Sequence, residues 1–213
     1  MSQNFADLLL LVDSRLPAGG HAHSGGIAPA IEAGLIKNID QLEAALRTRL
    51  KHQGPMQAAA VKLAAEGISA DEIDDALDIR MISRAARAAS RAQGRGLIRV
   101  ANEVWPEIVF GNGNLHHPVA FGVIAKSFGA SEIAPLAFLQ QSLMSGASAG
   151  VRLMGFDPIS VTYLISQMRG AVEEISKSIT QVENIDSIPS GSLPGLEALT
   201  ENYSKAQVRL FAS

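Results

Sequence analysis

Apolar residues recur in the segment 157–182, DPISVTYLISQMRGAVEEISKSITQV, at alternating intervals of four and three. The segment opens with Asp157-Pro158, a typical helix start, because aspartate caps free N–H groups and proline tolerates the first helical position. The apolar positions are Val161, Ile165, Met168, Val172, Ile175, Ile179 and Val182. This spacing predicts a helix with one narrow apolar stripe. The stripe packs either inside the domain or against a second copy across a two-fold dimer seam.

The rest of the chain also favours helices. Aromatic residues make up 5% of the 213 residues, alanine is abundant, and few runs alternate apolar and polar residues beyond four positions. Because strands are rich in aromatic and β-branched residues in alternation, this composition argues against sheet. We predict an all-α fold, a single-domain helical bundle of about 8–10 helices that spans residues 1–213.

Glycine, proline and capping residues predict where several helices begin and end. Gly54-Pro55 is expected to end a helix over 41–53 and to start a second, short helix after a tight corner. Ser69, with glutamate three residues later, has the spacing of a capping box. It opens a long helix that continues to Trp105, with an interruption expected at 94–96, where two glycines occur.

Residues 13–26, DSRLPAGGHAHSGG, form a polar loop that follows five consecutive apolar residues. Four glycines lie within eight positions, and Pro17 fixes its own φ. Apolar residues return at helical spacing from Ile27, so the loop joins two apolar elements. We therefore expect a loop of defined shape that serves recognition.

Composition excludes several classes of function. The net charge of −3 argues against a surface that follows nucleic-acid phosphates. The absence of cysteine excludes disulfides, thiolate nucleophiles and thiolate metal sites, and is compatible with a reducing compartment. The apolar core of residues 1–12 is too short for a signal peptide or a membrane span. We expect a cytoplasmic protein with no nucleic-acid partner and no membrane partner.

The histidines provide no convincing catalytic or metal-binding pattern. His21 and His23 offer two imidazoles, and His116 and His117 precede a proline at a helix start, but the sequence has no HExxH and no third ligand at helical spacing. We predict no resident metal and no cofactor. The alternative that stays open is a helical, histidine-dependent metal-binding protein or hydrolase that uses these four residues.

Other catalytic patterns are also missing. In each of the adjacent pairs Asp74-Asp75 and Glu173-Glu174, the two side chains point about 100° apart around the helix axis, so they cannot face one substrate together. The chain contains no GxxxxGK[ST] and no GxSxG, and its glycine triplets lack the strand that a phosphate loop needs. We predict that the protein is not an enzyme and has no catalytic residues.

Arginines recur along one side of the long helix. Their intervals are four, three, four and four, at Arg80, Arg84, Arg87, Arg91 and Arg95. This ridge is either a solvated face balanced by upstream aspartates, or a surface that docks an acidic protein.

The C-terminal tail is unusually apolar, with Val208, Leu210 and Phe211 beside Arg209. Free tails are usually polar and loosely held. Either this tail packs on the domain, or a partner covers it.

Several motifs along the chain carry a family resemblance when they are taken in order. They are the loop 13–26, Glu32-Ala33-Gly34-Leu35, Arg91 with Gly94-Arg95, His117-Pro118-Val119-Ala120-Phe121-Gly122, Ser148-Ala149-Gly150-Val151-Arg152-Leu153, and the ending Arg209-Leu210-Phe211-Ala212-Ser213. Over most of its length the chain resembles the UreF family of urease accessory proteins. In that family the loop usually has an aromatic residue where this chain has His21.

The resemblance implies an all-helical, homodimeric chaperone that acts in nickel insertion into urease and is not itself an enzyme. In the family, the protein binds a second accessory protein, UreD (also called UreH). The complex recruits the GTPase UreG to the urease apoprotein, which is therefore an indirect partner. GTP hydrolysis by UreG is coupled to nickel delivery.

The resemblance also implies which segments bind partners. They are the loop 13–26 and the tail 204–213. The expected contact residues are Pro17, Gly19, Gly20, His21, His23, Ser24 and Gly26 in the loop, and Arg209, Leu210 and Phe211 in the tail. Arg87, Arg91 and Arg95 form a candidate UreG-facing ridge.

Overall fold

A computed structural model of the chain describes residues 2–205 and Phe211, without the side chains of residues 2–4 and His21. Within these residues the chain forms ten α-helices, joined by loops and three short 3₁₀ turns, and no strand. This confirms the predicted all-α fold and the number of helices. The helices are α1 (Ser2–Val12), α2 (Ile27–Glu32), α3 (Ile39–Glu66), α4 (Ala70–Arg80), α5 (Arg84–Val104), α6 (His117–Ser127), α7 (Ala134–Met154), α8 (Pro158–Gln167), α9 (Arg169–Ser178) and α10 (Pro194–Tyr203).

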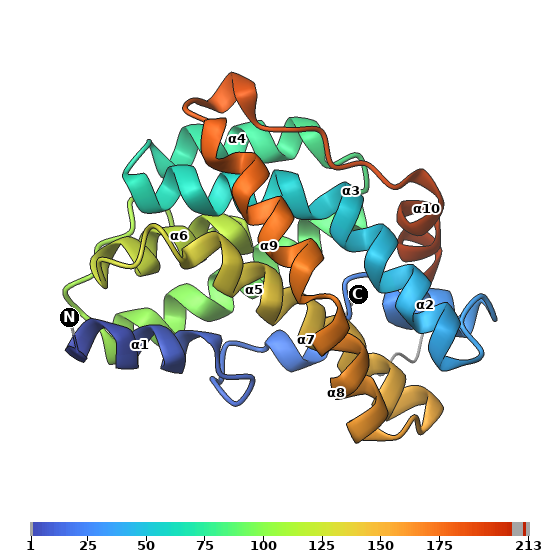
Figure 1. Cartoon of the computed structure of the whole chain (residues 1–213). Coiled ribbons are helices and arrows are strands. Elements are labelled where there is room, and N and C mark those ends of the chain that lie inside the picture. Colours follow the sequence, from blue (N-terminus) through green and yellow to red (C-terminus); the bar gives the residue numbers. More distant parts are fainter. Residues whose placement is uncertain (1, 206–210, 212–213) are drawn as a thin grey trace.

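Helix α3 is the central element, and α6, α7 and α9 pack against it (Figure 1). It runs unbroken through Gly54-Pro55 for 28 residues, so the predicted corner at these residues is wrong. Proline inside a helix removes one hydrogen bond and costs about 3 kcal/mol. Burial on both sides of Pro55 offsets this cost, because Leu50, Met56 and the alanines at 58–60 all lie in the core.

The break in the predicted long helix lies at 81–83, where α4 ends and α5 begins, and not at the glycines. Ser69 caps α4 as predicted, and Ser83 caps α5 by accepting a hydrogen bond from the Ala86 N–H. Gly94 and Gly96 lie within the continuous α5 and have a packing role. A Cβ atom would lie 1.9 Å from the Leu115 carbonyl oxygen at Gly94, and 2.2 Å from that of Ala18 at Gly96. The two glycines therefore let loop backbone approach α5.

The stripe in 157–182 is buried within one chain. Asp157 caps α8 as predicted, and the helix then breaks at Met168, so the segment forms α8 and α9. Val161, Met168 and Val172 are at most 3% exposed, and the helices contact α7 and, through α9, α3. The intramolecular interpretation of the stripe is therefore confirmed, and the stripe is not left open for a second copy.

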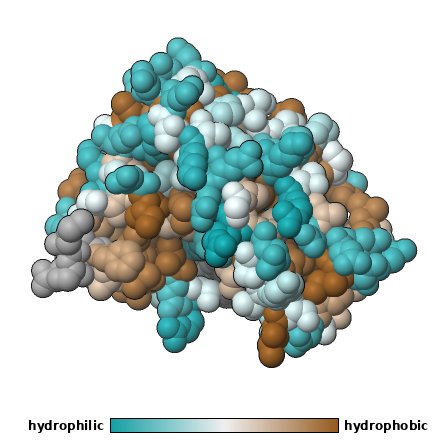
Figure 2. Space-filling view, in the orientation of Figure 1, coloured by the Kyte–Doolittle hydropathy of each residue, from teal (hydrophilic) through white to brown (hydrophobic). Residues whose placement is uncertain are grey.

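The described surface still carries apolar side chains, of which the hydrophobic patch over α1 at the lower left of Figure 2 is the clearest. Phe5 and Leu9 are each 54% exposed there, and on α8 Ile159 and Tyr163 are 79% and 66% exposed. None of the described helices has the length and hydropathy that a bilayer crossing requires. Exposed apolar faces such as those of α1 and α8 are candidates for contact with other proteins.

Candidate functional site: the glycine loop and the cavity beneath it

The glycine loop has a defined backbone course, as predicted. It contains a 3₁₀ turn at Gly20–Ala22, followed by Gly25 and Gly26 with φ of +62° and +91°. A Cβ atom on Gly25 would lie 2.4 Å from Cζ of Arg49, and one on Gly26 would lie 2.7 Å from Cγ of Leu196. Only glycine meets both requirements, a left-handed backbone and this close approach. The loop therefore packs directly on α3 and α10.

A side chain of α7 and a backbone N–H of α2 hold the loop in place. The Ser145 hydroxyl donates to the carbonyl oxygens of His23, at 2.5 Å, and Gly20, at 3.3 Å. The Ser24 hydroxyl accepts from the Ala28 N–H at 3.0 Å and so supports the first turn of α2. His23 and Ser24 are buried, and the His21 side chain lies outside the described residues.

At the start of the loop, Asp13 and Arg15 form an exposed ion pair with a nitrogen–oxygen distance of 2.6 Å. Hydrogen bonds from the Arg15 side chain and backbone lower the pKa of Asp13 to about 2. Pro17 lies on the exposed side of the loop. Of the seven predicted loop residues, Pro17 is therefore accessible, whereas His23, Ser24 and Gly26 support the loop from inside.

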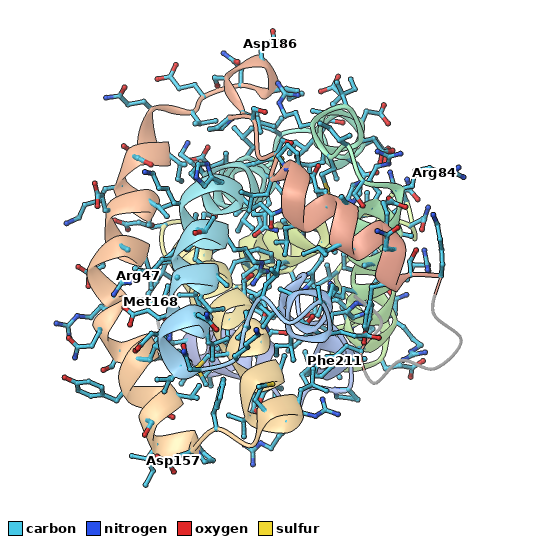
Figure 3. All side chains as sticks on the ribbon, turned by 90° about the vertical axis from the view of Figure 1, so that its right-hand side faces the viewer. Arg47, Arg84, Asp157, Met168, Asp186 and Phe211 are labelled. Atoms are coloured by element: carbon cyan, nitrogen blue, oxygen red, sulfur yellow. The ribbon has the colours of Figure 1, made fainter. Side chains whose placement is uncertain are left out.

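Phe211 packs back onto the domain (Figure 3). Its side chain is 2% exposed, its N–H donates to the Tyr203 hydroxyl at 3.4 Å, and the Arg152 guanidinium lies 4.7 Å from the centre of its ring. Of the two interpretations of the apolar tail, packing on the domain holds for Phe211. Arg209 and Leu210, the other predicted tail contacts, lie outside the described residues.

Three ridge arginines on α5, Arg87, Arg91 and Arg95, bond to their own chain. Arg91 forms salt bridges with Asp74 at 2.8 Å and with Asp78 at 2.6 Å, and it also donates to the Asn114 carbonyl. Arg95 donates to the Asn114 side chain at 2.7 Å. Arg87 donates to the carbonyl oxygens of residues 81 and 82. Arg95 is exposed, whereas Arg91 is largely covered.

His116 completes the network around Arg91. Its ring is fully buried, with Nε2 3.0 Å from the Asp78 carboxylate, and its N–H donates to Asp74 at 2.6 Å. Burial lowers the pKa of His116, although its hydrogen bond with Asp78 opposes this shift. The pKa of Asp78 is lowered in turn, because hydrogen bonds from His116 and Arg91 outweigh the effect of its own burial. This network joins α4, α5 and the start of α6.

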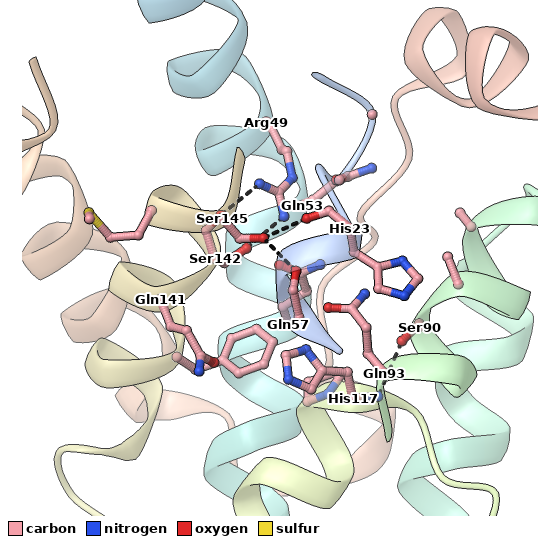
Figure 4. Close-up of a pocket in the computed structure, with 18 of the residues that line it drawn as sticks. His23, Arg49, Gln53, Gln57, Ser90, Gln93, His117, Gln141, Ser142 and Ser145 are labelled. Atoms are coloured by element: carbon pink, nitrogen blue, oxygen red, sulfur yellow. Dashed lines mark hydrogen bonds between the residues drawn. The ribbon is translucent and has the colours of Figure 1, made fainter. Parts of the chain in front are cut away.

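Beneath the loop lies a cavity of about 450 Å³ (Figure 4). Polar side chains from three helices point toward it: Arg49, Gln53 and Gln57 from α3, Ser90 and Gln93 from α5, and Gln141, Ser142 and Ser145 from α7. His23 of the loop and His117 of α6 also line it, and residues 191–200 contribute to a further wall. The cavity reaches the surface beside Ser14, Met144 and Arg152, its exposed lining residues.

Burial lowers the pKa values of two ionisable groups in the cavity, Arg49 and His117. Burial lowers the pKa of Arg49 to about 10 and that of His117 to about 4, the latter with smaller contributions from His23 and Arg49. At neutral pH Arg49 therefore keeps its charge, and His117 is a neutral imidazole. The His117 ring lies 5.1 Å from that of Phe138, which forms part of the cavity wall.

Three of the four histidines of the metal-binding alternative have described side chains, and these are not brought together as a ligand set. His23 and His117 share the cavity, whereas His116 is bound to Asp78. Among the described residues, no group of three or more histidine, cysteine, aspartate or glutamate side chains could hold a metal ion.

The cavity residues on the helices were not predicted from the sequence, although several of them recur at regular intervals. Arg49, Gln53 and Gln57 recur at intervals of four beside the buried leucines of α3, and Ser142, Ser145 and Ser148 recur at intervals of three on α7. A polar stripe next to an apolar stripe is typical of any amphipathic helix, so this spacing alone does not distinguish a cavity from a solvent-exposed face.

Comparisons with known proteins agree with the motifs. The family model described as UreF matches residues 36–169. A urease accessory protein UreF from Mycobacterium marinum is 36% identical, with 98% of each chain covered. Proteins of the same name from Mycolicibacterium vanbaalenii and Mycobacterium tuberculosis are 37% and 36% identical, with 99% of each chain covered. Similarity of this extent includes the glycine loop, the cavity helices and the tail. The chain therefore belongs to the UreF family of urease accessory proteins.

Proposed function

We propose that this chain is a non-catalytic scaffold in the maturation of urease. With UreD (UreH) it forms a complex that recruits the GTPase UreG to the urease apoprotein, where GTP hydrolysis is coupled to nickel insertion. The chain acts as a cytoplasmic homodimer, and its contribution is to supply binding surfaces. The observation that carries this proposal is the similarity to urease accessory proteins UreF over 98–99% of the chain.

The glycine loop and the C-terminal region are proposed to form the surface that binds UreD. Gly26 packs on Leu196 of α10, and α2 packs against α10, so the two segments are neighbours although they are far apart in sequence (Figure 1). Phe211 returns to the same domain under Arg152. This proximity supports one continuous contact in which both segments take part.

Co-purification with tagged UreD tests this surface. The full chain should retain UreD, and deletion of residues 208–213 should abolish retention, because it removes Phe211 and the residues around it. Phe211→Ala should weaken retention in the same direction, whereas Arg47→Ala, an exposed change on α3, should not. Retention of UreD by the truncated chain would exclude the tail from the contact. Failure of the full chain to retain UreD would overturn the scaffold proposal.

The arginine ridge of α5 is proposed to face UreG, with Arg95 as its accessible member. Arg95 is exposed, and its one hydrogen-bond partner among the described residues is the neutral Asn114, so it can change partners at little cost. Arg95→Glu should therefore weaken UreG binding to the complex with UreD and leave UreD retention unchanged. Arg47→Glu is the matched charge reversal on another helix. Equal UreG binding by both variants and the wild type would remove this assignment.

The homodimer and the metal-binding alternative are tested on the isolated chain. Light scattering should give the mass of two chains, and the exposed apolar faces of α1 and α8 are the candidate contacts (Figure 2). A mass of one chain would overturn the homodimer. Equilibrium dialysis should show no stoichiometric nickel or zinc. Tight binding that is lost in the His21→Ala, His23→Ala double variant would favour the metal-binding alternative.

A further inference from the structure

Arg49 is a cation inside the molecule without an anionic partner among the described residues. Its Nη1 donates to the Ser142 carbonyl oxygen at 3.1 Å, and its Nη2 donates to the Ser142 hydroxyl at 2.6 Å. Both acceptors are neutral. Within the described part of the chain, Arg49 forms no salt bridge, and its buried Nε has no hydrogen-bond acceptor. The backbone of Gly25 covers the guanidinium from the loop side.

Of the other ionisable cavity-lining residues that the structure describes, none forms a salt bridge with Arg49. The ionisable lining residues are Asp13, His23, Arg49, His117, Arg152 and Glu197. Asp13 is paired with Arg15, and Glu197 accepts from the Leu193 N–H at 3.1 Å and lies 3.5 Å from the Ser192 hydroxyl. A partly buried cation with neutral partners, whose Nε is buried without an acceptor among the described residues, is costly, so the cavity favours an anion that enters and approaches Arg49.

The other lining residues of the cavity indicate which further chemical groups the bound anion contains. The amide groups of Gln53, Gln57 and Gln93 supply neutral donors and acceptors along the cavity wall. Met56, Leu97 and Phe138 supply an apolar wall. The volume of about 450 Å³ lies within the range of small-molecule sites, about 300–1,000 Å³, and is far larger than an inorganic ion requires.

We propose that this cavity binds a small organic carboxylate, with its carboxylate group at Arg49 and its apolar part against Met56, Leu97 and Phe138. A carboxylate matches the planar, fork-like donors of a guanidinium better than a spherical ion does. The Ser142 contacts hold the guanidinium in place before the ligand arrives. The cavity lies beneath the loop proposed to bind UreD, and binding of a small ligand there goes beyond the scaffold function.

Calorimetric titration of the isolated full chain at pH 7, in buffer without chloride, tests the proposal with benzoate as the probe. Benzoate should bind at least tenfold more tightly than benzamide, its neutral analogue, and should raise the midpoint of thermal unfolding. Arg49→Met should weaken benzoate binding at least tenfold. Arg47→Met removes an exposed arginine two residues earlier on the same helix and should leave binding unchanged.

Two further probes separate the sources of the signal. Acetate and inorganic phosphate should bind more weakly than benzoate, because they cannot use the apolar wall. If either binds as tightly as benzoate through Arg49, the site takes a simple oxyanion and the organic ligand is excluded. If benzoate binding is absent, or is the same in the Arg49→Met variant, the proposal is overturned.

Gln53→Glu keeps the test decisive if Arg49→Met does not fold. Residue 53 lies one helical turn from Arg49 on the same side of α3, so a carboxylate there can pair with the guanidinium. The variant should have a higher midpoint of thermal unfolding than the wild type and at least tenfold weaker benzoate binding. A lower midpoint with unchanged benzoate binding would contradict the need for an anion beside Arg49.

Discussion

Replacing Arg91 by alanine removes the cation that joins Asp74 to Asp78. The Arg91 side chain is 18% exposed, and its partner Asp74 is 4% exposed. The change leaves the Asp74 carboxylate buried with a single hydrogen bond, from the His116 N–H. A carboxylate stranded in this way destabilises the fold far more than the loss of an exposed ion pair does.

The size of the effect follows from the burial of each partner. Breaking a buried ion pair by removing one partner costs about 3–5 kcal/mol. The second partner, Asp78, is 41% exposed, so its separate contribution is at most about 1 kcal/mol. We therefore expect Arg91→Ala to lower the free energy of unfolding by about 3 kcal/mol. For a chain of this size, that loss corresponds to a fall of about 6–12 °C in the unfolding midpoint.

Urea unfolding followed by circular dichroism measures this loss. Arg95→Ala is the control on the same helix face, and it should change the free energy of unfolding by less than about 1 kcal/mol, because Arg95 is exposed. Adding Asp74→Asn to Arg91→Ala should restore part of the stability, because the stranded charge is gone. A loss below about 1 kcal/mol in Arg91→Ala, or no recovery in the double variant, would refute the reasoning.

Two further predictions concern packing and pH. Gly94→Ala should lower the free energy of unfolding by about 1–3 kcal/mol, because its Cβ would lie 1.9 Å from the Leu115 carbonyl oxygen. At Gly170 in α9 a Cβ would meet nothing within 4 Å, so Gly170→Ala should be neutral or stabilising by up to about 1 kcal/mol. Urea unfolding measures both changes. Equal effects would contradict the packing role of Gly94. Burial lowers the pKa of His117 to about 4 from an ordinary 6.5, so the unfolded chain takes up the proton first as the pH falls. Stability should therefore fall by about 3 kcal/mol between pH 6.5 and pH 4 on account of this residue, at about 1.4 kcal/mol for each unit of pKa shift. His117→Gln should reduce this slope in unfolding curves measured across that range, and an unchanged slope would exclude His117 as its source.

Local signals in the sequence predicted the helical class and several helix starts correctly. Asp157 and Ser69 cap helices where they were expected, because a cap depends on a few neighbouring residues. Breaks were predicted less well. Gly54-Pro55 lies inside α3, and Gly94 lies inside α5, because packing of other helices and loops around them outweighs their low helix propensity.

In the candidate site, too, the features that depend on neighbouring residues were predicted and those that depend on distant residues were not. The glycine loop was visible in the sequence, since clustered glycines and a proline act through the backbone of their own segment. The cavity was not, because Arg49 and its partner Ser142 are 93 residues apart and meet only when α3 packs on α7. Whether the ridge arginines bind aspartates of their own chain or a partner was also left open by the sequence. Asp74 and Asp78 lie on α4, a separate helix that was predicted to be continuous with α5.

The sequence by itself determined that the chain is helical, where most of its helices lie, and which family motifs it carries, since periodicity, caps and motifs are short-range properties. Only the tertiary structure decided that the apolar stripe of 157–182 is internal, that Phe211 packs under Arg152, and that a charged arginine faces a cavity with polar and apolar walls. Burial and charge compensation depend on groups contributed by distant helices, and their energies are set only when those helices pack together.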